Sequence, residues 1–494
     1  MKFLVYSEVN AQTIASSMGQ SEYSYYFVLK EFLPVLRALG EVCIVKDPQA
    51  EADALYREAT AAGEQCVLLA FTPPHKTPLG LRCPTIPVLA WEFDTIPNEH
   101  WLKDRKQDWR YALGRCRRAI THSGMTLEAI RREMGLDYPV ISVPAPVWNR
   151  YEALRARLGQ ERRASVAMEM AACVVFDSQD PEHERFWPDW SEITASVAEV
   201  RGDNRQQNES AGLPEYREQS LLRITYRYAV EWYRQVGRQL LSGEMTLRPS
   251  VIDAQLRAFN EQPLPCPELW KPRPHRLELS GVVFTSMFNP GDGRKNWSDM
   301  LTAFCTAFRD SSDATLVFKL GSKDFERDMH EMMVCMARMP RFACRVVLLH
   351  GFLEGEVFES LIEASHFVVN ASYGEGQCLP LMEFLSCGRP AVAPRNSAML
   401  DYMDESVGFV VEGWADPAVW PHDPREAYRG LRQQADWESL VTAYRGAYQC
   451  AKMPEHYAAL SRNAIERMRG HCSRAVAERK LQDFLGLRDA SSRA

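Results

Sequence analysis

Two glutamates mark the stretch of this chain whose residue types are best suited to chemistry. Glu375 and Glu383, eight positions apart, lie within the run SYGEGQCLPLMEFLSCGRPAVAP at residues 372–394. The apolar run before it is typical of a buried strand, and a helix-compatible run extends from about Pro380 to Cys387. A loop between a strand and a helix N-terminus presents free N–H groups to an anion, so we expect a phosphate-binding site here.

Fixed carboxylates beside such a site suit a ligand that carries hydroxyl groups and a phosphate together, because carboxylates accept strong hydrogen bonds from hydroxyl groups. A nucleotide sugar has this combination. The alternative is an ordinary strand–turn–helix unit in which Glu375 is solvated and Glu383 interacts with the helix dipole. The residues of this segment alone leave both interpretations open.

The segment resembles the E-x7-E signature of retaining glycosyltransferases of the GT-B fold, family 4 type. It matches that signature at Glu375, Gly376, Leu379, Pro380 and Glu383, and the run GRPAVA at residues 388–393 follows in register. The sequence departs from the family at Cys378, which stands for a glycine, and at Phe384, which stands for an alanine. We therefore expect a less free loop and altered helix packing.

The resemblance implies an α/β fold of GT-B type, in which two Rossmann-like domains face a cleft. It also implies hexosyl transfer from a nucleoside-diphosphate sugar to a saccharide, a lipid-linked molecule or another cell-envelope acceptor, as in polysaccharide biosynthesis. By resemblance, Glu375 holds sugar hydroxyls and Glu383 holds the nucleotide ribose. The donor diphosphate is expected against the backbone amides of Gly376, Gln377, Cys378 and Leu379. Retention in this family is usually explained by front-face attack, so no protein nucleophile is expected.

A basic turn follows the strand-like run at residues 282–287. Arg294 and Lys295 resemble the family's donor-phosphate cations, which stabilise the leaving group. The family's arginine usually lies further upstream, where this chain has Asn289 and Pro290, so either Arg294 substitutes for it or one cation is missing. The alternative is a solvated basic turn. Because no D-x-D motif follows a strand, we expect no metal ion and no cofactor.

Three further segments resemble donor-binding parts of the family. Gly351 and Phe352 follow a strand-like run and resemble the turn whose backbone reads the nucleotide base. Gly19 lies in a small-residue loop similar to the family's glycine-rich loop. Lys319, which ends another strand-like run, either lies near the diphosphate or is solvated.

The acceptor side is less well defined. Family 4 enzymes often have a histidine near the position where this chain has Glu92 and Asp94. These carboxylates either hold acceptor hydroxyls or cap the following helix. His122 ends a strand-like run and either faces the predicted cleft or is a buried structural histidine.

Length and composition are those of a multidomain globular protein. At 494 residues, the chain exceeds the size of a single core, and a net charge of −7 gives no reason to expect a nucleic-acid partner. The 13 cysteines form no C-x-x-C pair, which favours reduced thiols. The opening run is short and soon polar, unlike a signal peptide, and no apolar stretch approaches bilayer length, so we expect a cytoplasmic protein.

Short apolar runs alternate with amphipathic ones in two parts of the chain, which predicts two parallel sheets covered by helices. We expect an N-terminal Rossmann-like acceptor domain at residues 1–148 and a donor-binding domain at 276–470. A mostly helical insertion and linker at 149–275 lies between them, with residues 150–175 helical. A C-terminal helix at 471–494 is expected, by resemblance, to cross back to the first domain.

The segment Trp101–Arg118 bears on partners, because basic residues alternate there with Trp101, Trp109 and Tyr111. It suits either peripheral contact with the inner, anionic face of a membrane or an ordinary solvated surface. Two other functions remain open: a nucleotide-sugar epimerase of the same fold, and a non-catalytic sugar-nucleotide-binding partner subunit.

Overall fold

The computed structural model describes residues 1–9, 23–101, 103–158, 165–188, 225–226, 229–230, 268–421 and 423–487. The chain divides into a large compact unit, residues 1–185 with 268–494, and a second unit at 186–267. Almost all of the second unit, and with it most of the predicted insertion, lies outside the described residues. The large unit contains one wholly parallel sheet and one mostly parallel sheet.

The first sheet is wholly parallel and has the strand order β2-β1-β3-β4-β5-β6. Its strands are the predicted short apolar runs, and its inner strands are almost fully buried because helices cover both faces. The strands are β1 Lys2–Tyr6, β2 Glu41–Ile44, β3 Cys66–Ala70, β4 Thr85–Leu89, β5 Ala119–Thr121 and β6 Val140–Ser142. The helices are α1 Tyr23–Leu39, α2 Pro48–Ala61, α3 Trp109–Cys116 and α4 Gly124–Met134.

The second sheet has eight strands in the order β14-β13-β12-β9-β10-β11-β7-β8. Six of them run parallel to one another: β9 Val282–Phe288, β10 Ala314–Leu320, β11 Arg345–His350, β12 Phe367–Val369, β13 Ala391–Pro394 and β14 Gly408–Val411. Four helices connect them: α10 Trp297–Ala307, α11 Phe325–Ala337, α12 Gly355–Ala364 and α13 Leu379–Ser386. The predicted α/β class with two Rossmann-like units is therefore confirmed.

The helical prediction for residues 150–175 is wrong beyond the first few residues. After the 3-10 turn Trp148–Tyr151 and α5 Glu152–Leu158, the chain forms the long strand β7 Ser165–Asp177. β7 pairs antiparallel with β11 and with β8 Arg273–Ser280. Side chains at the start of β7 alternate between buried and exposed, which is the strand period of two, whereas its Ala, Met and Glu content favours helix. Sheet pairing overrides that propensity.

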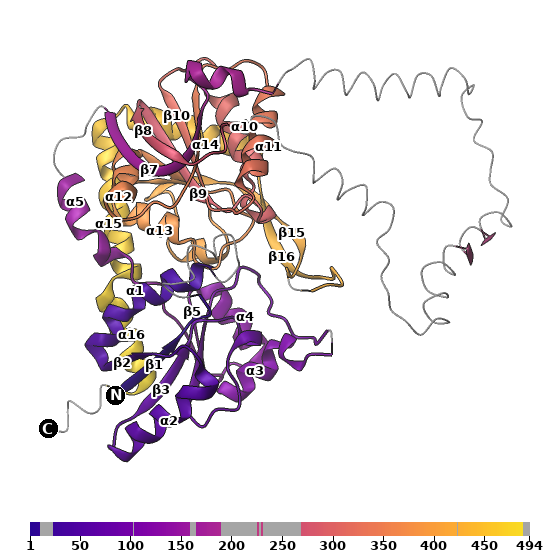
Figure 1. The fold of residues 1–494 in the computed structure, drawn as a ribbon, viewed down its shortest axis with the longest axis vertical. Helices are drawn as coiled ribbons and strands as arrows, with labels where there is room; N and C mark the ends of the chain where they lie inside the picture. The colour runs from indigo at the N-terminus through magenta and orange to yellow at the C-terminus, as the bar shows by residue number, and fades with distance from the viewer. Residues whose placement is uncertain are drawn as a thin grey trace. The chain divides into compact units, whose positions relative to one another are not determined.

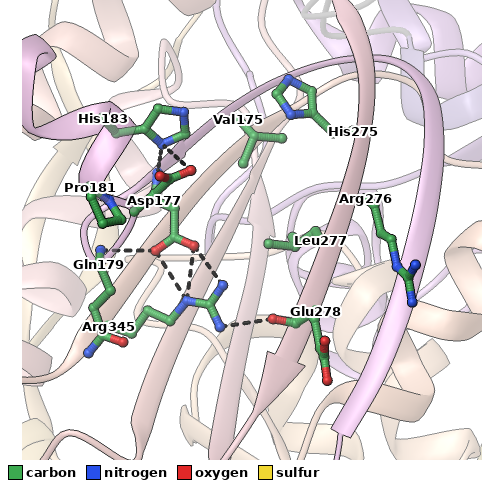
Figure 2. A pocket seen from close by; sticks show the side chains of 11 residues that line it. Val175, Asp177, Gln179, Pro181, His183, His275, Arg276, Leu277, Glu278 and Arg345 are labelled. Atoms are coloured by element: carbon green, nitrogen blue, oxygen red, sulfur yellow. Dashed lines mark hydrogen bonds and ion pairs between the residues drawn. The ribbon is translucent and has the colours of Figure 1, made fainter.

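A partly buried ion pair joins the end of β7 to the start of β11. The Arg345 guanidinium donates to both carboxylate oxygens of Asp177, with Nη2 2.6 Å from Oδ2 and Nε 3.1 Å from Oδ1 (Figure 2). Arg345 Nη1 also donates to the Glu278 carbonyl of β8. This pair therefore joins all three strands at the outer side of the sheet.

The C-terminal segment joins the two α/β parts. It comprises the hairpin β15 Gly413–Val419 and β16 Tyr428–Ala435 and the helices α14 Trp437–Ala451, α15 Pro454–Cys472 and α16 Arg474–Leu485. α16 packs against α1 (Figure 1), and Lys480 of α16 donates to the Ser142 carbonyl at the end of β6. The hairpin contacts the loop after β4, where Thr95 donates to the Arg429 carbonyl at 2.7 Å.

Candidate functional site

The strand order of the second sheet defines where a ligand is expected. The chain passes from β9 to β10 and β11 on one side, and then returns to place β12 on the other side of β9. Open parallel sheets bind ligands at the carboxyl ends of the strands beside such a reversal. The turn after β9 carries Arg294 and Lys295, and the loop after β12 carries Glu375. The sheet therefore brings together three residues that the sequence predicted for one site.

Glu375 is the centre of this arrangement and is 5% exposed. Its Oε1 accepts hydrogen bonds from Lys295 Nζ at 2.6 Å, Ser372 Oγ at 2.6 Å and Asn370 Nδ2 at 3.3 Å. Its backbone N–H donates to Ser397 Oγ at 2.7 Å. All three side-chain hydrogen bonds to the carboxylate are thus accepted by Oε1. Oε2 has a longer contact, with a guanidinium group.

That guanidinium belongs to Arg294. Its Nη1 lies 3.6 Å from Glu375 Oε2 and 3.5 Å from Glu92 Oε1, and it donates to the Gly374 carbonyl at 2.9 Å. Its Nε donates to Asp292 at 2.8 Å. Burial alone lowers the pKa of Arg294, but the surrounding carboxylates outweigh it and raise that pKa. The Arg294–Lys295 turn therefore carries two cations that face three carboxylates.

These contacts fix the charge of Glu375. Burial raises the pKa of a carboxyl group, but the charges of Lys295 and Arg294 and the hydrogen bonds from Lys295 and Ser372 outweigh it and lower the pKa of Glu375 to about 2. Glu375 is therefore ionised at neutral pH and can only accept hydrogen bonds. The balance is different at Glu92. Burial raises the pKa of Glu92, and the charge of Arg294 lowers it by less, so the pKa stays above its usual value.

The second predicted glutamate is held by a different set of residues. Glu383 lies in α13, and its Oε1 accepts from Tyr151 OH at 2.8 Å and lies 3.5 Å from Arg150 Nη1. The same Arg150 nitrogen lies 3.3 Å from Glu31 Oε1 in α1. One guanidinium thus bridges carboxylates from α1 and α13 through the segment after β6.

This environment leaves Glu383 only weakly acidic. Burial raises its pKa to about 7, against the opposing effects of the Arg150 charge and the Tyr151 hydrogen bond. Glu383 therefore exists in both protonation states near neutral pH. The two glutamates of one motif have pKa values shifted in opposite directions.

The loop that joins them packs closely against the first sheet. A Cβ at Gly376 would lie 2.9 Å from Ala90 Cβ, and Gln377 Oε1 accepts from the Ala145 N–H at 2.7 Å. Cys378 has φ 61°, which is a left-handed conformation that glycine adopts without strain. A residue with a side chain, such as this cysteine, adopts it at a cost of about 1–2 kcal/mol. That the backbone amides of residues 376–379 bind a diphosphate remains a prediction.

The remaining donor-side candidates are Gly351, Phe352 and Gly19. Gly351 follows β11 with φ 151°, and a Cβ there would lie 2.5 Å from Cys173 Sγ, so a side chain cannot be accommodated. Phe352 is 43% exposed. Gly19 lies outside the described residues.

The acceptor-side candidates are already engaged. Glu92 faces Arg294, and Asp94 Oδ1 accepts from the Leu431 N–H of β16 at 2.7 Å. Neither caps α3, whose N-cap is Asp108, so the capping alternative is wrong. His122 is buried, and its Nδ1 bonds the Val143 carbonyl at 2.8 Å. Burial lowers the pKa of His122 to about 4, so the ring is neutral at neutral pH.

The segment predicted to suit a membrane surface has its tryptophans inside. Trp101 and Trp109 are 6% and 1% exposed and belong to the core beneath β4 and β5. The two tryptophans cannot insert into a bilayer, which leaves the partly exposed Tyr111 and the basic side chains of this segment for such contact. In the described part of the chain, no helix is both long and apolar enough to span a membrane. Nor do any three described His, Cys, Asp or Glu residues form a group able to hold a metal ion.

A cavity of about 370 Å³ lies elsewhere, between β7, β8 and the start of β11 (Figure 2). Its lining includes the Asp177–Arg345 pair, His183 and His275. It lies at the amino end of β11, opposite the edge at which parallel sheets bind ligands. None of the predicted site residues lines it.

Sequence reasoning missed most of the residues that hold the two glutamates. Asn370 and Ser372 come directly after β12, so their place at the strand end was a usable signal. Tyr151 and Glu31 lie far from Glu383 in the sequence, and no pattern connects them to it. Only the folded chain brings them together.

Comparisons with known proteins found similarity in structure alone. No protein-family description and no curated protein matches the chain. Among solved structures, Anabaena Alr3699/HepE in complex with UDP-glucose has 12% identity and a TM-score of 0.47, covering 98% of this chain and 99% of that one. WaaG, a glycosyltransferase involved in lipopolysaccharide biosynthesis, has 11% identity and a TM-score of 0.46, covering 98% and 100%.

A structure of S. aureus TarM with UDP has 9% identity and a TM-score of 0.41, and this chain spans 55% of its length. These identities and TM-scores are low. The candidate site therefore rests on the contacts among Glu375, Lys295 and Arg294 and not on these similarities.

The opposite pKa shifts predict opposite effects of pH on two matched variants. Glu375 is ionised more readily in the folded protein, so Glu375→Gln should be less stable than the wild type at pH 7, by about 3 kcal/mol, with the gap closing as pH falls from about 4.5 towards 2. Ionisation of Glu383 opposes folding, so Glu383→Gln should gain stability relative to the wild type as pH rises from 5 to 8. Denaturant unfolding across this range measures both, and two pH-independent differences would contradict the assignment.

Proposed function

We propose that this protein is a glycosyltransferase that moves a sugar from a nucleoside-diphosphate sugar to an acceptor. The observation that carries the proposal is the group formed by Arg294, Lys295 and Glu375 at the strand-order reversal of the second sheet. It combines cations for a diphosphate with a fixed carboxylate for hydroxyl groups. Its agreement with the sequence motif, found independently of the fold, supports the same function.

Each member of this group has a definite chemical capacity. Lys295 and Arg294 would stabilise the charge that develops on the departing diphosphate, and preorganised cations in a buried site are effective in this role. Glu375 Oε1 already accepts three hydrogen bonds, so Oε2 has the greater remaining capacity to accept one from a sugar hydroxyl. As an ionised carboxylate, Glu375 cannot act as a general acid.

We further propose retention of configuration, with the departing phosphate accepting the acceptor's proton and no covalent enzyme intermediate. Glu383 would contact the nucleotide ribose, with Tyr151 and Arg150 fixing its orientation. The acceptor class is proposed to be a saccharide or a lipid-linked molecule, and a cytoplasmic location with peripheral membrane contact remains a prediction.

The direct test is incubation of the protein with nucleotide sugars, alone and with cell-envelope acceptor fractions. We expect sugar transfer only when acceptor is present, with the anomeric configuration retained in the product. Isomerised nucleotide sugar without acceptor would indicate an epimerase. Binding without either reaction would indicate a non-catalytic subunit, and either result would contradict the proposal.

Lys295 offers a sharper test of the mechanism. Lys295→Ala should lower the rate of transfer by about 100-fold or more, on the scale of removing one preorganised charge stabiliser. Lys323→Ala is the matched control, because Lys323 is exposed beside the same strand edge and should leave the rate unchanged. Circular dichroism would verify that both variants are folded, and normal turnover by folded Lys295→Ala would remove it from the mechanism.

The proposed mechanism uses side-chain cations in place of a divalent metal ion. Transfer should therefore continue at an unchanged rate in excess EDTA, as measured by product formation over time. Loss of activity in EDTA, with recovery on addition of magnesium or manganese, would show that the metal-independent mechanism is incorrect.

A further inference from the structure

Lys319 is a buried lysine near the carboxyl end of β10 and is 9% exposed. Its neighbours in the sheet are Met287 of β9 and Leu349 of β11, both apolar. Among the described residues, no carboxylate lies within ion-pair distance of its ammonium group and no acceptor is hydrogen-bonded to it. Burying an unpaired charge is costly, so native structures normally pair it.

The nearby titratable groups do not supply the missing anion. Burial raises the pKa of the Cys173 thiol in β7, with Lys319 acting in the opposite direction, so the thiol is neutral at neutral pH. Burial lowers the pKa of His350 at the end of β11 to about 4, with Lys319 contributing, so this ring is also neutral. The ammonium group therefore has only uncharged groups near it from β7, β9 and β11.

Lys319 lies at the same sheet edge as the candidate site. Gly321 donates to the Phe288 carbonyl at 2.9 Å, which joins the end of β10 to the end of β9, where the Arg294–Lys295 turn begins. Adjacent strands lie about 4.8 Å apart, so Lys319 is one strand from that turn and one strand from the Gly351 turn after β11. A ligand that extends from one turn to the other passes the end of β10.

The charges at this edge are unevenly matched. Arg294 and Lys295 are already close to Asp292, Glu92 and Glu375, so that turn carries no excess of positive charge. A diphosphate placed there would need a further cation. Lys319 is a cation without a carboxylate partner among the described residues, and it lies within one strand of the place where the charge is needed.

We propose that Lys319 binds the anionic part of a nucleoside diphosphate. It would supply positive charge that Arg294 and Lys295 cannot supply in full, because nearby carboxylates already neutralise these two cations. This inference rests on the proposed function and adds a binding residue to its site. The sequence resemblance left Lys319 as either a phosphate neighbour or a solvated side chain, and its exposure of only 9% favours the first alternative.

The proposal has a second consequence, which concerns protons. Burial lowers the pKa of Lys319 to about 8, with Cys173 opposing that shift. A bound anion restores the charged form, so binding near pH 8 should be accompanied by uptake of about half a proton. At pH 6.5 the ammonium group is already charged, and uptake by Lys319 should be absent.

Isothermal titration calorimetry with uridine, guanosine and adenosine diphosphates tests both consequences. Lys319→Met should weaken diphosphate binding about 10- to 100-fold, whereas Lys323→Met, at an exposed lysine of the same edge, should bind like the wild type. Titrations at pH 8 in buffers of different ionisation enthalpy should show proton uptake by the wild type and none by Lys319→Met. Inorganic pyrophosphate and the three nucleosides distinguish recognition of the diphosphate from recognition of the base.

The outcomes separate this inference from the proposed function. If the wild type binds a diphosphate and Lys319→Met binds it equally well, the role of Lys319 is overturned while the proposed function stands. If the wild type binds none of the diphosphates, both are overturned. The proton measurement on the wild type needs no variant, so absence of proton uptake throughout the range of about pH 7–9 overturns the role of Lys319 even if Lys319→Met does not fold.

Discussion

The ion pair between Glu375 and Lys295 is the interaction on which the site depends. It joins the turn after β9 to the loop after β12, across the place where the strand order of the second sheet reverses. Arg294 extends this connection to Glu92 in the loop after β4. Glu375 is buried and its partners Lys295, Arg294 and Glu92 are partly buried, so removing Lys295 would leave the Glu375 carboxylate without its nearest cation, at a cost that approaches the roughly 3–5 kcal/mol typical of a fully buried pair. The same contacts that stabilise the fold therefore arrange the chemical groups.

The two glutamates of the motif show how the environment assigns chemistry to identical side chains. Glu375 lies beside two cations and several hydrogen-bond donors, which keep it ionised. Glu383 shares Arg150 with Glu31 and has Tyr151 as its main hydrogen-bond donor, so burial dominates and its pKa rises. A fixed anion suits hydroxyl recognition in the proposed reaction. Glu383, whose carboxyl group titrates near neutral pH, contacts Tyr151 and Arg150 in the segment after β6. Through Arg150 it is connected to Glu31 of α1.

Local patterns predicted the parallel strands and the position of Glu375 in a loop after one of them, because a buried parallel strand and the loop after it leave a continuous apolar run followed by polar residues. They failed where a distant partner decides the structure. β7 reads as helix from its Ala, Met and Glu content, and only pairing with β8 and β11 makes it a strand. Likewise, Tyr151 is hydrogen-bonded to Glu383, and Asp94 to the Leu431 N–H. The residues of each pair are more than two hundred positions apart in the sequence. Such contacts leave no periodic signal.

The carboxyl edge of the second sheet is proposed to bind a nucleoside diphosphate. A thermal-shift titration of the intact protein with a panel of nucleoside diphosphates, with the corresponding nucleosides as controls, tests it most directly. A ligand that binds the folded state raises apparent stability by mass action, by about 2.7 kcal/mol at 100 times its Kd. We predict a concentration-dependent rise in melting temperature with at least one diphosphate and a much smaller rise with its nucleoside. No shift with any diphosphate at millimolar concentration would contradict the account.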